Sequence, residues 1–132
     1  MKHCNPIVEA VKGSSLIVGA PCSEENVAKH GIVDVDEKGK VISFLEKPSP
    51  TETQSRTQSP CFYLLSSEAA GRVKEFLEIH RNNKRKIDST GSFIQYLVSS
   101  SPVYVFDVAQ RFDLGNLASC IEADEYFENH EL

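Results

Sequence analysis

Charged side chains follow strand-like apolar runs at several points of this sequence, and their types are those that bind a phosphorylated, hydroxylated molecule. Glu46 and Lys47 directly follow one such run, and Pro48 stiffens the chain where the two charges leave it. Asp113 follows another, with a glycine two residues later. A lysine can neutralise a phosphate, a neighbouring carboxylate can accept hydrogen bonds from sugar hydroxyls, and an aspartate offers the hard oxygen that Mg²⁺ prefers. The combination suits a phosphorylated sugar bound with a metal ion.

Each of these positions also has a simpler interpretation. Glu46 and Lys47 fit an exposed strand end, and Asp113 fits an aspartate that approaches or caps a helix. The sequence contains no GxGxxG motif and no P-loop. Spacing alone therefore leaves both interpretations open, and the elements around these residues have to decide between them.

The composition is that of a single globular domain covering residues 1–132. Hydrophobic residues make up 40% and charged residues 25%, and the apolar runs are only a few residues long. We therefore expect no membrane span and, because the first residues lack an apolar export signal, a cytoplasmic location. The net charge is −5, with one short cationic run at residues 84–86. Nucleic acid is a poor candidate partner, because phosphate contacts require clustered positive charge.

The cysteines and histidines show no spacing that is typical of a metal site. The four cysteines are widely scattered and no CxxC occurs, so a zinc site is not expected. We expect reduced thiols, mostly buried as small apolar side chains. None of the histidines forms HxxxH or HExxH, and His80 is predicted to lie at the end of a helix.

Strand and helix patterns alternate along the chain and predict an α/β fold with a mixed β-sheet flanked by helices. Two β-branched runs, 31–36 and 40–46, surround a Gly-containing turn and predict a hairpin. Residues 49–60 contain no hydrophobic residue, so we expect a mobile lid or binding loop there. The remaining predictions are buried strands at 14–20, 61–65 and 103–108, a helix tail at 7–12, and helices after Ser67, after Asp88 or Ser89, and after Asn116.

Four motifs, taken in order, resemble the second half of the sugar-phosphate nucleotidyltransferases, the pyrophosphorylases of nucleotide sugars. They are "AKHGIVDVDEKGKVISFLEKPSP", "CFYLL", "DSTGSFIQYLVSSSPVYVFDV" and "RFDLGNLASCIEADEYF", and the match covers about residues 14–127. The resemblance implies a Rossmann-like nucleotidyltransferase fold that lacks its N-terminal nucleotide-binding half. Residues 1–132 would then be a partial domain, the sugar-phosphate-binding half.

The resemblance also implies roles for individual residues. Lys47 would contact the phosphate of the sugar phosphate and act in catalysis, while Glu46 and Tyr63 would bind the sugar substrate. Asp113 would be the second of two carboxylates that hold Mg²⁺. The implied reaction is attack of a sugar-1-phosphate oxygen on the α-phosphorus of a nucleoside triphosphate, with release of pyrophosphate. Such a reaction depends on alignment and charge neutralisation.

The sequence departs from the family pattern in three ways. Cys61 stands where the family has a glycine beside the sugar, and Asn116 replaces a threonine. The family's glycine-rich nucleotide loop and first metal aspartate do not occur in these 132 residues. We therefore expect a fragment that binds a hexose 1-phosphate or a nucleotide sugar but is inactive alone. A non-catalytic regulatory or subunit-interaction module, or a folded remnant, are the alternatives.

The missing half has a consequence for the surface of the fold. A sheet without its neighbouring strands should expose an unpaired edge and apolar side chains. We therefore expect a homo-oligomer, a strand-exchanged dimer, or pairing with an N-terminal half.

Overall fold

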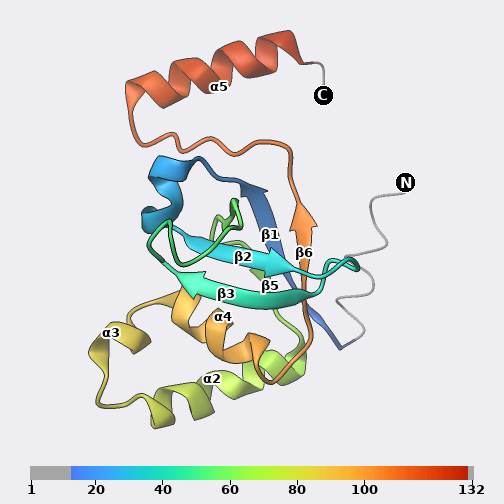
Figure 1. Ribbon diagram of the computed structural model, residues 1–132, viewed down its shortest axis with the longest axis vertical. Helices are drawn as coiled ribbons and strands as arrows, with labels where there is room; N and C mark the ends of the chain where they lie inside the picture. Colours follow the sequence, from blue (N-terminus) through green and yellow to red (C-terminus); the bar gives the residue numbers. More distant parts are fainter. Residues whose placement is uncertain (1–12, 131–132) are drawn as a thin grey trace.

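A computed structural model describes residues 13–130, in which a six-stranded mixed sheet is flanked by helices (Figure 1). This arrangement confirms the predicted α/β class, while the helix tail predicted at 7–12 lies outside the described residues. The strands are β1 (Ser15–Pro21), β2 (Gly31–Val35), β3 (Val41–Glu46), β4 (Thr57–Ser59), β5 (Tyr63–Leu64) and β6 (Val103–Asp107). The helical elements are η1 (Glu24–Lys29), α2 (Ser67–Ile79), α3 (Lys84–Ile87), α4 (Thr90–Val98) and α5 (Leu117–Asn129).

Strand β1 is the centre of the sheet because it pairs with three other strands. It runs parallel to β6 over five residue pairs, antiparallel to β5 at Leu16 and Ile17, and antiparallel to β4 at Ala20 and Pro21. The order across the sheet is β3-β2-β4-β1-β5, with β6 on β1. The unbroken apolar stretch of β1 follows from this position, since a strand covered on both faces needs no alternation of polar side chains.

The predicted hairpin is confirmed as β2 and β3. Its turn is fixed by Asp36, whose Oδ1 accepts from the backbone N–H groups of Lys38 and Lys40 at 2.8 and 3.0 Å, and by Gly39 at φ 77°. The hairpin delivers Glu46 to the end of β3, directly opposite Gly31 at the start of β2.

The prediction of a mobile loop over residues 49–60 is wrong for its second part. Residues 57–59 form β4, which pairs with β1 on one side and β2 on the other. Its side chains are polar, yet Gln58 and Ser59 are buried. A strand between two others satisfies its backbone through both neighbours, so it can be held in the sheet without apolar side chains.

The buried strand predicted at 61–65 shrinks to the two residues of β5. Cys61 has φ 60° and, like Phe62, is exposed, so the chain turns before it pairs. Cys61 and Cys120 are exposed free thiols and only Cys22 is buried, which overturns the expectation of mostly buried cysteines for the three that are described.

Helix α4 packs against the sheet at β3, and α2 and α3 pack against α4 on the side away from α5 (Figure 1). The helix predicted after Asp88 or Ser89 is confirmed as α4, and its Phe93, Ile94 and Leu97 belong to the main core. The side chain of Ser89 caps α4 by accepting from the N–H of Ser92, which decides between the two predicted caps. In α2, Phe76 is buried and packs edge-on against Phe93 with ring centroids 5.4 Å apart.

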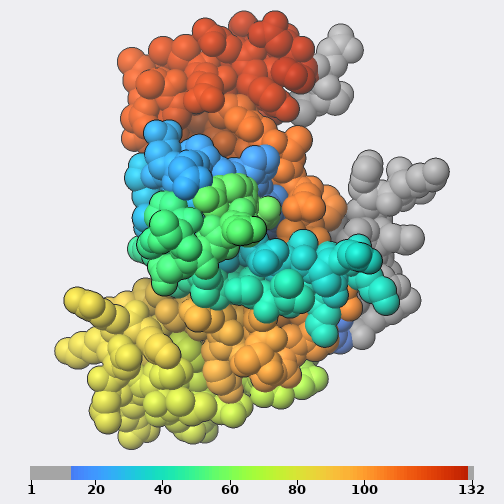
Figure 2. Space-filling view, viewed as in Figure 1, coloured from blue at the N-terminus to red at the C-terminus, as the bar shows by residue number. Residues whose placement is uncertain are grey.

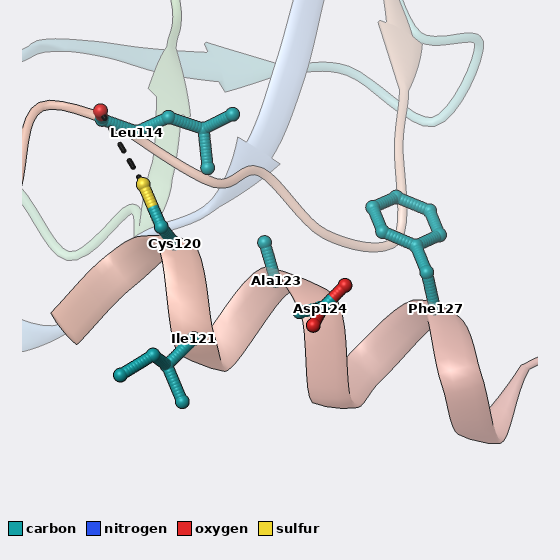
Figure 3. A pocket seen from close by; sticks show the side chains of 6 residues that line it. All are labelled: Leu114, Cys120, Ile121, Ala123, Asp124 and Phe127. Atoms are coloured by element: carbon teal, nitrogen blue, oxygen red, sulfur yellow. Dashed lines mark hydrogen bonds between the residues drawn. The ribbon is translucent and has the colours of Figure 1, made fainter. Parts of the chain in front are cut away.

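Helix α5 stands apart from the other helices. It lies at the end of the molecule opposite α2–α4, with the segment 108–116 between it and the sheet (Figures 1 and 2). Cys120 and Ala123 face this segment, and the Cys120 thiol donates to the Leu114 carbonyl at 3.7 Å (Figure 3). Ile121 and Phe127 are more than half exposed. None of the helices within residues 13–130 has the length and apolarity needed to cross a membrane.

Candidate functional site

A cavity of about 370 Å³ lies where the end of the hairpin, strands β4 and β5, and the start of α4 meet. This volume is within the range of small-molecule sites. It gathers three of the four residues predicted from sequence, Glu46, Lys47 and Tyr63. The lining residues are Lys29, His30, Gly31, Glu46, Lys47, Ser59, Cys61, Tyr63, Asp88, Ser89, Thr90 and Gly91.

The carboxylate of Glu46 is held against the first turn of α4. A Cβ atom placed on Gly91 would lie 1.6 Å from Glu46 Oε2, so only a glycine lets the carboxylate come this close. The N-terminal end of a helix carries partial positive charge, which favours a negative group there. Glu46 is therefore positioned by a long-range contact between β3 and α4.

Lys47 takes an unusual backbone conformation that turns it out of the strand. Its φ is 51°, in the left-handed region, and its N–H donates to the carbonyl of His30 at 3.1 Å. Pro48 is buried behind it, while the side chain of Lys47 is exposed at the cavity. The Glu-Lys-Pro sequence thus separates two opposite charges, with the carboxylate against the helix and the amine facing solvent.

Tyr63 supplies a phenol to the same cavity. Burial raises the pKa of Tyr63 to about 12, and the neighbouring Cys61 thiol acts in the same direction. The phenol therefore stays protonated at neutral pH and can donate a hydrogen bond to a ligand oxygen.

His30 contributes an imidazole that is kept neutral. Burial lowers the pKa of His30, and the positive charges of Arg111 and Lys29 lower it further, against the opposing effect of Asp113 and Glu46. A neutral imidazole can either accept or donate a hydrogen bond. The pKa of His30 therefore responds both to charges that line the cavity and to charges on the segment that follows β6.

Asp113, the fourth predicted residue, does not line the cavity. It is well exposed, and its Oδ2 lies 3.6 Å from Nη2 of Arg111. No group of three acidic, histidine or cysteine side chains that could hold a metal ion occurs within residues 13–130. Asp113 offers one carboxylate beside a guanidinium, and its role in holding Mg²⁺ stays a prediction.

Several cavity residues were not among the sequence predictions. Ser59 was hidden inside a polar run that gave no strand pattern. His30 and Lys29 directly precede the hairpin. Only the pairing of the two strands, which brings the start of β2 close to Glu46, would have indicated that they line the cavity. Once the hairpin register is known, Gly31 opposite Glu46 identifies both.

The arrangement can bind and orient an anionic, hydroxylated molecule. Lys47 and Lys29 bring positive charge to the cavity, Glu46 and Asp88 offer acceptors, and Tyr63 offers a donor. Such a site aligns and neutralises a ligand without attacking it covalently.

Comparison with known proteins identifies relatives of this chain. A family model described as nucleotidyl transferase matches residues 5–130. The chain is 29% identical over 107 residues to a glucose-1-phosphate adenylyltransferase of Anaeromyxobacter sp. (strain Fw109-5), a match that covers 76% of this chain and 26% of that protein. It is 32% identical over 85 residues to glucose-1-phosphate adenylyltransferase 1 of Vibrio cholerae serotype O1, covering 61% and 20%.

Solved structures share the fold. The chain superposes on an apo UDP-glucose pyrophosphorylase with a TM-score of 0.71 at 18% identity, which covers 99% of this chain and 48% of that one. A UTP-bound UGPase from Acinetobacter baumannii gives a TM-score of 0.68 at 18% identity, covering 98% and 45%. The chain thus spans about a quarter of the curated relatives and about half of the solved structures.

Proposed function

The chain belongs to the nucleotidyl transferase family, and from this premise we propose that its cavity binds the sugar-phosphate part of a hexose 1-phosphate or a nucleotide sugar. The convergence of Glu46, Lys47 and Tyr63 on one cavity of suitable size carries the proposal. Lys47 would neutralise the phosphate, and Glu46 and Tyr63 would hold sugar hydroxyls. The two curated relatives carry glucose 1-phosphate in their names, which supports a hexose 1-phosphate as the ligand.

We further propose that this chain is the sugar-phosphate-binding half of a larger catalytic unit. The solved structures of the same fold are about twice as long as the matched region. Asp113 provides one carboxylate, so a Mg²⁺ ion there would need ligands from outside residues 13–130. Residues 1–132 alone should therefore show no pyrophosphate release from a nucleoside triphosphate and glucose 1-phosphate.

Calorimetry with glucose 1-phosphate tests the binding proposal. The Lys47→Ala variant should bind about 10- to 100-fold more weakly than the wild type, since a hydrogen bond to a charged group contributes about 1.5–3 kcal/mol. The matched control is Lys38→Ala, which removes an exposed lysine of the hairpin turn. Equal affinity of both variants, or no binding by the wild type, would contradict the proposal.

A non-catalytic subunit-interaction module is a second candidate function. The observation that favours it is α5, whose Leu117, Ile121 and Phe127 are 76%, 51% and 52% exposed. Apolar side chains that gather on one helix are typical of a surface that another chain covers. Rescue of pyrophosphorylase activity by adding a separate polypeptide with the family's nucleotide loop would favour the catalytic half over this module.

A further inference from the structure

We propose that Cys61 determines the specificity of the cavity, and that its thiol and the Ser59 hydroxyl together restrict the site to hexose phosphates without a bulky substituent. The inference rests on the proposed function, because it concerns the same cavity. The inference adds which residues of the cavity lining select among sugars.

Cys61 lines the cavity at a position whose backbone conformation favours glycine. Its φ of 60° lies in the left-handed region, and Cys61 lines the cavity immediately before β5. A glycine at this position would leave the ligand in contact with the backbone. Cys61 instead brings a thiol to the lining of the cavity, beside the phenol of Tyr63.

Ser59 provides an independent indication that a ligand belongs here. It is 2% exposed and lines the same cavity, and its buried Oγ makes no hydrogen bond of ordinary geometry among the described residues, although it lies close enough to the Tyr63 phenol to lower the pKa of that group. A buried hydroxyl left unpaired costs about 1–3 kcal/mol. A sugar hydroxyl placed in the cavity would supply the missing partner.

Cys61 and Ser59 precede Tyr63 by two and four residues and line the same cavity. The Cys61 thiol is the neighbouring group that most raises the pKa of Tyr63, after burial, which places it beside the phenol. A sugar that donates to Ser59 and accepts from Tyr63 would therefore lie against the thiol. Any substituent directed toward Cys61 would collide with it.

Thiol alkylation measures whether a bound ligand covers Cys61. Iodoacetamide transfers its carboxamidomethyl group to the thiolate sulfur and releases iodide. Trypsin places each cysteine on a separate peptide, because Lys12, Lys29, Arg56, Arg72 and Arg111 separate them. The exposed Cys120, which lines the pocket beside α5, is the internal control.

Glucose 1-phosphate at about ten times its dissociation constant should slow the alkylation of Cys61 about tenfold. The alkylation of Cys120 should stay unchanged. Cys61 alkylated at the same rate with and without bound ligand would overturn the inference. No binding of glucose 1-phosphate in calorimetry would instead overturn the proposed function, so the two failures are distinguishable.

Substitution tests the selection itself. Cys61→Gly should improve binding of N-acetylglucosamine 1-phosphate relative to glucose 1-phosphate by about tenfold or more, the size of effect expected when one or two atoms are removed from a fitted pocket. Cys61→Ser keeps the shape and should retain the wild-type preference. Ser59→Ala should weaken glucose 1-phosphate binding by about two- to tenfold. An unchanged sugar preference in Cys61→Gly would overturn the role of Cys61.

Discussion

Replacing Gly91 by alanine tests whether the carboxylate of Glu46 is fixed against the first turn of α4. The new Cβ would lie 1.6 Å from Glu46 Oε2 and 2.6 Å from Glu46 Cδ, whereas ordinary contact begins at 3.4 Å. The carboxylate oxygen must therefore retreat by about 1.8 Å, the difference between 1.6 and 3.4 Å. Phe44 lies 3.3 Å from the same Cβ and limits movement on its side.

The size of the effect follows from two opposing contributions. Overpacking costs about 1–3 kcal/mol, while alanine is favoured over glycine in a helix by up to about 1 kcal/mol. We expect Gly91→Ala to lower the free energy of unfolding by about 1–2 kcal/mol. When Glu46→Ala has removed the carboxylate, the same glycine substitution should be neutral or stabilising. The coupling between the two sites should therefore be about 2 kcal/mol.

Urea unfolding of the wild type, both single variants and the double variant measures this coupling. Gly71→Ala is the matched control, because a Cβ on that glycine of α2 meets no atom within 4 Å, and it should stabilise the protein by up to about 1 kcal/mol. Changes that add within about 0.5 kcal/mol would show that Glu46 and Gly91 do not interact. Glu46 would then not be positioned by α4.

Three further predictions concern His30, Cys61 and α5. Because burial, and then Arg111 and Lys29, lower the pKa of His30, its contribution to stability is complete above the unfolded value of 6.5 and is lost as the pH falls through the lower folded value. His30→Gln should therefore flatten the loss of the unfolding midpoint as the pH falls from 6.5 toward the folded value, and an unchanged profile would refute this. Cys61→Gly should raise the free energy of unfolding by about 0.5–1 kcal/mol, since it relieves a left-handed φ, and a destabilised variant in urea unfolding would contradict that cause. Ile121→Lys combined with Phe127→Lys should reduce self-association in sedimentation experiments and leave the fold intact, because both side chains are more than half exposed. A wild-type protein that stays monomeric at high concentration would show that Ile121 and Phe127 of α5 do not mediate self-association.

Much of the fold could be predicted because its elements carry local patterns. The hairpin follows from two β-branched runs around a glycine turn, and α4 follows from a serine cap and apolar residues at helical spacing. Strand β4 could not be predicted in this way. Its polar residues are buried because β1 and β2 pair with it on both sides, and that environment is created by residues distant in the sequence.

The candidate site shows the same division. Glu46 and Lys47 were found because a strand end, two opposite charges and a proline are adjacent in the sequence. Asp113 follows β6 beside Arg111 and acts electrostatically on His30 at the cavity, while its role as a Mg²⁺ ligand stays a prediction. The strained φ of Cys61 was hidden, because a left-handed backbone at a cysteine has no sequence pattern of its own.

Titration of the isotope-labelled protein with glucose 1-phosphate, followed by amide NMR, tests the central claim most directly. We predict that the amide signals of Lys47, Cys61 and Gly91 shift together in a saturable manner, while those of α5 stay in place. Signals around the cavity that do not move, or shifts confined to α5, would contradict the proposal that this cavity binds a sugar phosphate.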